Sequence, residues 1–162
     1  MVDQTVQGPV VVPTGSQCYL IGTTVIGGIV VQPGGSLELE SSVVRGSIAA
    51  QRASVALYED VEVTRNIESR WPTYFEITGS TVGGSVTVRD REPGAGSIFI
   101  DEFRGHNTIG SHLVANSNAG DAPFDIYANF IGGHLVCLSN PTPPAHADNV
   151  VAGHTTGQCA GG

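Results

Sequence analysis

Apolar and polar residues alternate along most of the chain, and the alternation repeats at a fixed interval. Every second residue of an extended strand faces the same side, so alternation predicts β-strands rather than helices. The pattern that begins at Val25 recurs three times, each copy nineteen residues after the last. The residues on one side of the four copies are Val25, Gly27, Ile29, Val31; Val44, Gly46, Ile48, Ala50; Val63, Arg65, Ile67, Ser69; and Val82, Gly84, Val86, Val88.

The repeat extends in both directions, and each unit carries a second strand. Val10 and Val12 continue it backward, while residues 109–115 and 131–137 continue it forward after insertions. The second strand of each unit has a pair of alternating apolar residues: Cys18 and Leu20, Leu37 and Leu39, Val55 and Leu57, Phe75 and Ile77, Ile98 and Ile100, Phe124 and Ile126. Gly, Pro, Asn and Asp separate the strands, as expected for turns.

A nineteen-residue unit with two or three short strands cannot bury its apolar faces alone, so it must stack on its copies. We therefore predict an all-β, single-domain parallel β-helix of about six coils. Residues 1–9 are expected to form an N-terminal extension, residues 10–137 the β-helix, and residues 138–162 a Pro/Gly-rich C-terminal cap without strands. Polar side chains are expected to stack at one corner, or simply to be turn residues: Thr23, Ser42, Asp60, Ser80, Asn107 and Asn129.

Composition narrows the choice of partners. The formal net charge is -8 with only seven Lys plus Arg, which argues against nucleic acid and anionic membranes. No apolar run is long enough to span a bilayer, and the opening MVDQTVQGPV lacks the regions of a signal peptide. Cations, neutral glycans or another protein, including a second copy, remain as expected partners.

Three cysteines without a CxxC pair argue against a zinc site. Cys137 and Cys159 bracket the Pro-rich segment and are predicted to form a disulfide that staples it to the last coil, the alternative being two free thiols. Cys18 takes the inward position that Leu37 holds one unit later, which favours a buried and inert thiol.

At this point the chain resembles a known group of proteins. The units TTVIGGIVV, SVVRGSIAA and STVGGSVTV, the opening GSQCYLIGTTV and the ending IGGHLVCLSNPTPPAHADNVVAGHTTGQC are similar to secreted actinobacterial right-handed parallel β-helix proteins, mostly hypothetical. The resemblance implies a right-handed β-helix that is secreted or at the cell surface, and it implies no activity. The loops RDREPGAGS and ANSNAGDAPF, and Arg65, depart from the pattern. A weaker likeness is to bactofilins, which polymerise end to end.

One outer face combines acids and aromatic rings, the side chains that bind sugars or calcium. Its candidate ligand residues are Tyr19, Glu38, Glu40, Tyr58, Glu76, Phe99, Asp101, Asp125 and Tyr127. The alternative is that these residues only keep the face soluble. Arg70 or Arg104 is a candidate base or anion clamp, and the loops at 89–97 and 116–123 are expected to wall a groove.

A second face is expected to be flat and almost uncharged. His112 and His134 take equivalent positions there and form a weak candidate metal site, with His106 nearby. The other outward residues are Ile26, Val30, Ala49, Thr64, Thr87, Val114 and Val136, with Arg45 and Glu68 as the only charges. This face is a candidate packing surface, unless residues 138–162 cover it.

No Walker loop, GxSxG elbow or HExxH motif is present, and no catalytic residue is assigned. We expect a non-enzymatic extracellular β-solenoid with a structural, adhesive or self-assembling role, in a filament or a surface layer. The alternative is a polysaccharide-binding or lyase-like protein that uses the acidic aromatic face. No cofactor is expected, although calcium is compatible with the acidic residues.

Overall fold

The computed structural model describes residues 1–160 and consists of strands, turns and loops, with no helix among them. The strands form three parallel sheets. The first sheet contains β1 (Thr5–Gln7), β4 (Thr24–Ile26), β7 (Val43–Val44), β10 (Glu62–Val63), β13 (Thr81–Val82), β16 (Thr108–Ile109), β19 (Phe130–Ile131) and β22 (Val150–Val151). The second contains β2 (Val10–Val12), β5 (Ile29–Val31), β8 (Ile48–Gln51), β11 (Ile67–Arg70), β14 (Val86–Arg89), β17 (Leu113–Asn116), β20 (Leu135–Leu138) and β23 (Thr155–Gly157). The third contains β3 (Gln17–Ile21), β6 (Ser36–Glu40), β9 (Ser54–Tyr58), β12 (Tyr74–Thr78), β15 (Ile98–Asp101), β18 (Phe124–Tyr127) and β21 (Ala145–Ala147).

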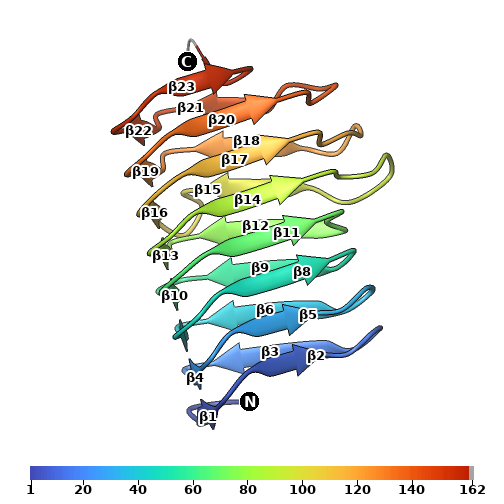
Figure 1. Ribbon diagram of the computed structural model, residues 1–162, viewed down its shortest axis with the longest axis vertical. Coiled ribbons are helices and arrows are strands. Elements are labelled where there is room, and N and C mark those ends of the chain that lie inside the picture. Colours follow the sequence, from blue (N-terminus) through green and yellow to red (C-terminus); the bar gives the residue numbers. More distant parts are fainter. Residues whose placement is uncertain (161–162) are drawn as a thin grey trace.

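Each turn of the chain contributes one strand to each sheet in succession, which makes a β-solenoid of about eight turns. In Figure 1 the front strands of the second sheet run to the right, and those of the third sheet return behind them as the chain climbs from the N-terminus. This winding is right-handed. The predicted parallel β-helix is therefore confirmed, with eight turns rather than about six.

The nineteen-residue repeat is the register of the sheets. Val25 pairs with Val44, Ile29 with Ile48 and Leu20 with Leu39, so equivalent apolar residues of successive turns lie directly above one another. These columns face inward and are almost fully buried along most of the solenoid. Stacking therefore does what a single turn cannot do, because each turn buries its apolar edges against the turns above and below.

Both ends of the chain take part in the solenoid, contrary to the expected extension and strandless cap. Strand β1 lies within residues 1–9 and pairs with β4 of the next turn. Strands β21, β22 and β23 lie within residues 138–160 and form an eighth turn. In the last turn His146 and Thr155 stand in register with the aliphatic Ile126 and Leu135, so the apolar alternation that marks the other turns is absent there.

The corner between the third and first sheets carries the expected polar column, with one change. Ser42 accepts a hydrogen bond from the Thr23 amide at 3.0 Å, and the Asn107 side chain donates to Asn129 at 3.0 Å. Asp60 was expected in this column, but the buried residue in register is Val61. Asp60 instead adopts a left-handed backbone conformation (φ 56°) one residue earlier, and it is exposed.

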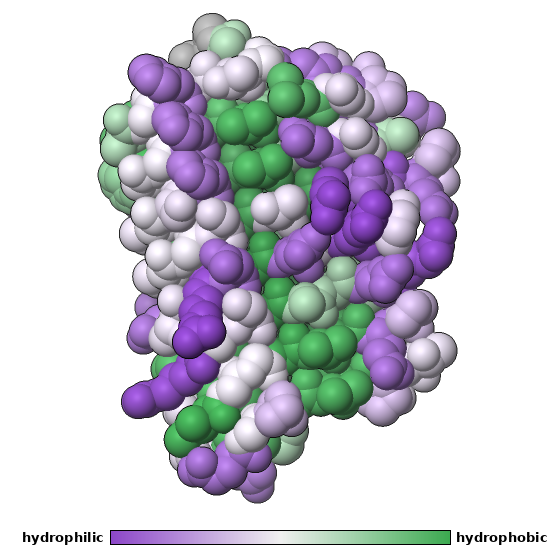
Figure 2. Space-filling view, in the orientation of Figure 1, coloured by the Kyte–Doolittle hydropathy of each residue, from purple (hydrophilic) through white to green (hydrophobic). Residues whose placement is uncertain are grey.

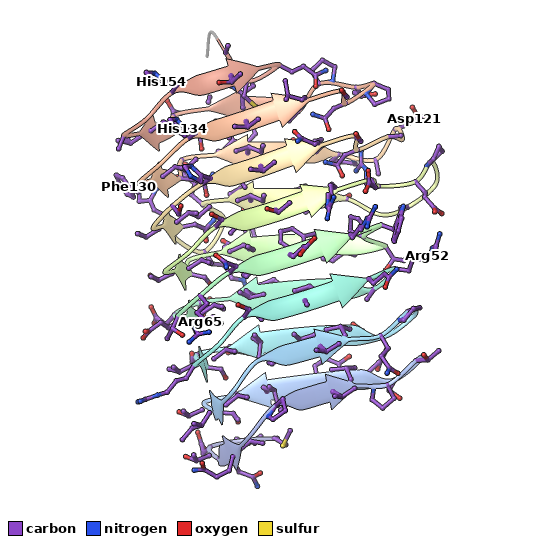
Figure 3. The ribbon with its side chains drawn as sticks, viewed as in Figure 1. Arg52, Arg65, Asp121, Phe130, His134 and His154 are labelled. Carbon is purple, nitrogen blue, oxygen red and sulfur yellow. A yellow bond between two sulfur atoms is a disulfide. The ribbon has the colours of Figure 1, made fainter. Side chains whose placement is uncertain are left out.

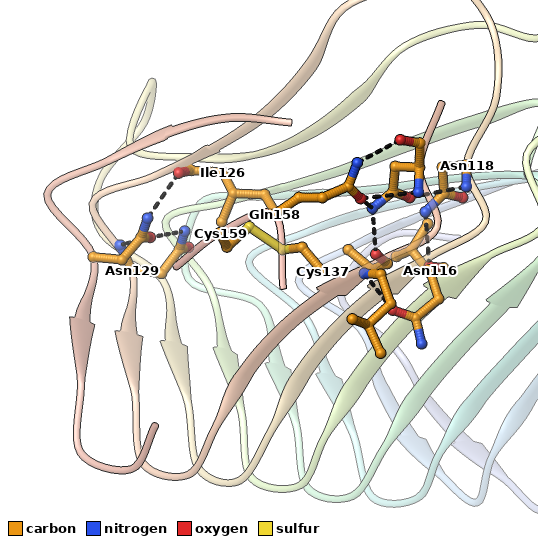
Figure 4. The surroundings of a disulfide bond; sticks show 12 residues. Asn116, Asn118, Ile126, Asn129, Cys137, Gln158 and Cys159 are labelled. Carbon is orange, nitrogen blue, oxygen red and sulfur yellow. Dashed lines mark hydrogen bonds between the residues drawn. A yellow bond between two sulfur atoms is a disulfide. The ribbon is translucent and has the colours of Figure 1, made fainter. Parts of the chain in front are cut away.

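A second polar column, at the corner between the second and third sheets, was not expected from the sequence. The Asn118 side chain accepts a hydrogen bond from the Arg91 amide, and Asn140 accepts one from Asn118 at 2.9 Å. The Gln158 side chain accepts from Asn140, also at 2.9 Å (Figure 4). These buried amides connect the last turns where the backbone leaves the sheets.

Candidate functional site

The third sheet presents the acidic aromatic face in the predicted register. Its first outward column is Tyr19, Glu38, Ala56, Glu76, Phe99 and Asp125, and its second is Ile21, Glu40, Tyr58, Thr78, Asp101 and Tyr127. Two of these positions are buried, namely Ala56 and Thr78. The face is therefore continuous in register but interrupted near its centre, where the Thr78 hydroxyl accepts a hydrogen bond from the Arg104 amide.

The most organised part of this face is a carboxylate held by two tyrosines. The Tyr58 hydroxyl donates to Glu76 Oε2 at 2.7 Å, and the Tyr74 hydroxyl donates to the same oxygen. The Tyr74 ring also packs edge-on against Phe99, with ring centres 6.3 Å apart. Tyr74 was not among the predicted site residues; its place at the start of β12, two residues before Glu76 and so on the same face, was the available signal.

The surroundings of Glu76 favour the neutral form of its neighbours. Burial, the hydrogen bond to Glu76 and the charge of that carboxylate raise the pKa of Tyr58 to about 12. The same causes, in the same order, raise the pKa of Tyr74. Burial also raises the pKa of Asp101 and of Asp125, and the charge of Asp101 adds to the effect on Asp125. The face therefore concentrates negative charge in a partly dehydrated setting.

Neither arginine suggested as a base or clamp pairs with a carboxylate of the two outward columns. Arg70 lies in the second sheet, donates to Asp90 at 3.1 Å and stacks on Trp71 with its guanidinium 4.2 Å from the ring centre. Arg104 lies over Tyr58 and donates to Glu59 at 3.1 Å. Both cations are already engaged, so the geometry does not assemble a catalytic set.

The two long loops leave the same corner, as predicted, but pack together instead of walling a groove. Arg91, from the first loop, is only 2% exposed. Its guanidinium donates to main-chain oxygens of both loops, including Ala119 at 2.8 Å, Pro123 at 3.2 Å and Gly96 at 3.3 Å. Burial lowers the pKa of this guanidinium. Arg91 thus joins the loops into one unit, a role that the sequence did not reveal.

His112 and His134 lie on consecutive turns as predicted, and a third histidine, His154, follows them. The rings are stacked, with centres 5.0 and 5.4 Å apart, and Figure 3 shows His134 and His154 one above the other. The spacing of GSH, GGH and AGH along the chain was the signal for the third member. His106 lies elsewhere, at the corner between the third and first sheets beside Phe130.

The hydrogen bonds of this column argue against metal binding by His112 and His134. Each Nδ1 accepts the backbone N–H of the next histidine at 2.9 Å. A neutral imidazole whose Nδ1 accepts must carry its proton on Nε2, which leaves no lone pair there for a metal. No cluster of three or more His, Cys, Asp or Glu suited to a metal ion occurs among residues 1–160.

The second sheet carries an apolar stripe on its early and late turns, visible in Figure 2 over the front strands, and Glu68 and Thr87 interrupt it in between. The column in register is Val11, Val30, Ala49, Glu68, Thr87, Val114, Val136 and Thr156. Ile26, Arg45 and Thr64 were expected here, but Ile26 ends β4, and the other two follow β7 and β10, so all three belong to the first sheet. Arg70 and Arg89 add charges beside the stripe. The chain to residue 160 continues the solenoid and does not cover the stripe.

Cys137 and Cys159 form the predicted disulfide between β20 and the end of the last turn (Figure 4). Both residues are almost fully buried. Cys18 is the free cysteine among the described residues; it pairs in register with Leu37 and is half-buried, and burial raises its pKa. The expected inward position of Cys18 is therefore confirmed.

Comparisons with protein families, with characterised proteins and with solved structures give no match. The described residues contain no helix long and apolar enough to cross a membrane.

Proposed function

We propose that this protein is a non-enzymatic, extracellular structural β-solenoid whose copies associate head to tail into filaments. The observation that carries the proposal is that strands at both ends of the solenoid have free backbone edges. Within residues 1–160, β1 and β2 at one end, and β21, β22 and β23 at the other, each pair with a single neighbouring strand. Unpaired edges of this kind are templates for pairing with another chain.

The N-terminal end is apolar as well as open. Val6, Val10 and Cys18 occupy core columns but are only partly buried, because no turn lies beneath them. Residues 1–3 run along β3 and hydrogen-bond to it, for example through the Asp3 amide and the Ile21 oxygen at 2.9 Å, so they belong to the same end surface. Covering this end would remove apolar surface from water.

The C-terminal end offers a more polar partner surface. Its last turn places His146 and Thr155 in columns that hold aliphatic residues in the turn below, Ile126 and Leu135. A hollow of about 250 Å³ opens there between the last strands, lined in part by Val151, Thr155 and Cys159. The two ends are therefore different, which suits a contact between unlike ends.

Strand direction favours head-to-tail stacking over a symmetric dimer. All strands of a sheet run parallel, so the first turn of one copy can continue the ladder of the last turn of another without reversal. Two copies joined by their N-terminal ends would leave both C-terminal edges unpaired. A contact between unlike surfaces does not close on itself and generates a filament. The disulfide supports the extracellular setting, because disulfides persist in oxidising compartments.

Val11 provides a sharp test of edge pairing. The Val10 amide donates to Gly28 and the Val12 oxygen accepts from Gln32, both at 3.0 Å, so the backbone of Val11 between them points away from β5. Val11→Pro removes this outward N–H without breaking the internal ladder. Val11→Thr keeps the N–H and is the matched control.

We expect wild type and Val11→Thr to form long filaments under negative-stain electron microscopy, and Val11→Pro to remain a folded monomer by analytical ultracentrifugation. Strictly monomeric wild-type protein at high concentration in native buffer would refute the proposal. Particles of two copies only would reject the head-to-tail arrangement, and filaments of unchanged length from Val11→Pro would reject the edge as the contact.

The cluster around Glu76 favours glycan binding as a second candidate function. Two phenols orient the carboxylate, and the Phe99 ring beside them offers an apolar surface for a sugar face. A glycan array and a lyase absorbance assay with calcium test it. Binding that is lost in Phe99→Ala and kept in Tyr19→Phe would support the candidate, and silence in both assays would remove it.

A further inference from the structure

We infer that the histidine column of His112, His134 and His154 is an acid-sensitive lock that holds the last turns of the solenoid together. The column lies at the corner between the first and second sheets, on the last three turns. It is the upper part of a longer ladder in which one side chain per turn accepts the backbone N–H of the next turn. The inference concerns the folded monomer and does not depend on assembly.

The ladder uses different side chains for the same bond. Ser47 accepts the Asn66 amide at 3.3 Å, and Asn66 accepts the Ser85 amide at 2.8 Å. Ser85 in turn accepts the His112 amide at 3.3 Å. Above this point the acceptors are imidazoles, at His112 and at His134, both at 2.9 Å. The lower acceptors do not titrate near neutral pH, whereas imidazole does.

The packing around the imidazoles leaves little room for another arrangement. A Cβ added to Gly133 would lie 2.5 Å from His112 Nδ1, and one added to Gly153 would lie 2.6 Å from His134 Nδ1. Glycine is therefore required at both positions for the rings to approach the next turn. The rings are held with Nδ1 facing the backbone, and a ring flip would have to break the same contact.

Protonation of an imidazole changes its Nδ1 from a hydrogen-bond acceptor into a donor. An imidazolium carries a proton on both nitrogens, so Nδ1 becomes a donor that faces the backbone N–H of the next histidine. The two N–H groups then lack an acceptor, which costs more at the partly buried His134 amide than at the exposed His154 amide. Three cationic rings would also be stacked with centres 5.0 and 5.4 Å apart, where they repel.

No counterion is available nearby to stabilise the charged rings. The strands beside the column, β16, β17, β19, β20, β22 and β23, contain no Asp, Glu, Lys or Arg. On the turn below, β14 ends at Arg89, whose guanidinium donates to Glu68. Arg65 lies lower on the same corner, and Glu102 pairs with His106 at another corner. Among residues 1–160, no ion pair includes a histidine of the column.

Acid should therefore weaken the backbone hydrogen bonds between the last turns while those of the lower turns stay intact. The test is amide hydrogen exchange of dilute, monomeric protein between about pH 8 and about pH 5, which bracket the ordinary titration of histidine. Rates are corrected for intrinsic exchange. Protection of the His134 and His154 amides is expected to fall about tenfold at the lower pH, the loss that ~1.4 kcal/mol per bond produces. Protection of the Ser85 amide, which is held by Asn66, is expected to stay constant.

The double variant His112→Asn/His134→Asn is the matched control, because Asn66 makes the same bond in the same ladder. It should keep the protection of residues 134 and 154 at both pH values. Equal pH responses at residues 85, 134 and 154 would overturn the inference, as would a pH-dependent loss that persists in the Asn variant. If the variant does not fold, the nitrogen chemical shifts of the wild-type imidazoles identify the protonated nitrogen of each neutral ring. Protonation on Nε2 is expected, and protonation on Nδ1 would overturn the inference.

If the copies assemble as proposed, acid would also disorder β22 and β23, which supply the C-terminal edge. Filaments would then shorten at low pH in wild type and persist in the Asn variant. Protection changes in monomers without any filament would retain the lock and reject the assembly, so the two proposals fail separately.

Discussion

In the early turns the strands of the first and second sheets repeat every nineteen residues and most corner side chains are small. The last turns of these sheets are spaced by twenty-two and twenty residues and use Asn and His at the corners. Ser42 is typical of the early turns and Asn129 of the late ones. A regular period lets aliphatic columns stack with little polar support. The late turns are less regular, and longer side chains must satisfy the backbone at their corners.

The two regions also end differently. The first turn has an apolar, partly uncovered core at Val6 and Val10, while the last turn is fastened to its neighbour by Cys137 and Cys159. Terminal turns of a solenoid lack one neighbour and so lose half of their stacking contacts. The disulfide and the polar ladders compensate for that loss at one end only, which leaves the other end as the natural contact surface.

Removal of the disulfide should have the largest effect and should act on the late turns alone. Cys159→Ser is expected to destabilise the protein by about 3 kcal/mol, the value for a closed loop of this length in the chain-entropy model. Thermal unfolding measures the loss, and hydrogen exchange should locate it in β21, β22 and β23. Cys18→Ala is the control. An equal loss of hydrogen-exchange protection in the first turns would show that the two regions are not stabilised independently.

The polar ladder should matter more in the late turns than in the early ones. The Asn129 side chain donates to the oxygens of Ile100 at 2.8 Å and Tyr127 at 2.9 Å, and it accepts from Asn107. Asn129→Ala leaves these buried groups unpaired and is expected to cost about 2 kcal/mol. Ser42→Ala is expected to cost about 1 kcal/mol. Chemical denaturation of both variants checks the order, and the reverse order would contradict the comparison.

The smallest expected effect concerns the centre of the solenoid, between the two regions. Folding raises the pKa of Tyr58 to about 12, so above the ordinary value of about 10 only the unfolded state readily loses this proton. Stability should therefore fall as pH rises from about 10 to about 12. Phenolate absorbance of the folded protein should show that Tyr58 loses its proton only at high pH, and Glu76→Gln should move this titration to lower pH. An ordinary titration in wild type would contradict the hydrogen-bonded cluster.

Much of the fold was predictable because every turn of a stacked solenoid needs apolar residues at the same inward positions. Val25, Val44, Val63 and Val82 fill one column, and a strand that alternates at a fixed period has one arrangement that buries all of them. The outward register of the acidic face followed from the same period. The strands of the last turn were missed because His146 and Thr155 take core positions that hold Ile126 and Leu135 one turn below.

The candidate surfaces were predictable only in part, because side-chain partners depend on contacts between turns. The sequence placed Glu76 on the correct face but did not identify Tyr74 as its second donor. It also aligned His112 with His134, but the backbone N–H that each imidazole accepts became apparent only from the close approach of the next turn at Gly133 and Gly153. That contact changed the interpretation from a metal site to a structural ladder.

The sequence by itself determined the repeat and the inward columns and indicated the disulfide, because these depend on periodic burial and on spacing along the chain. Only the tertiary structure decided that Arg91 joins the two long loops, that the chain to residue 160 extends the solenoid, and that the terminal strands of the described residues pair on one side. These features depend on which backbone groups remain unpaired after the turns have stacked, and hydrogen-bond partners that lie twenty or more residues apart leave no local pattern in the chain.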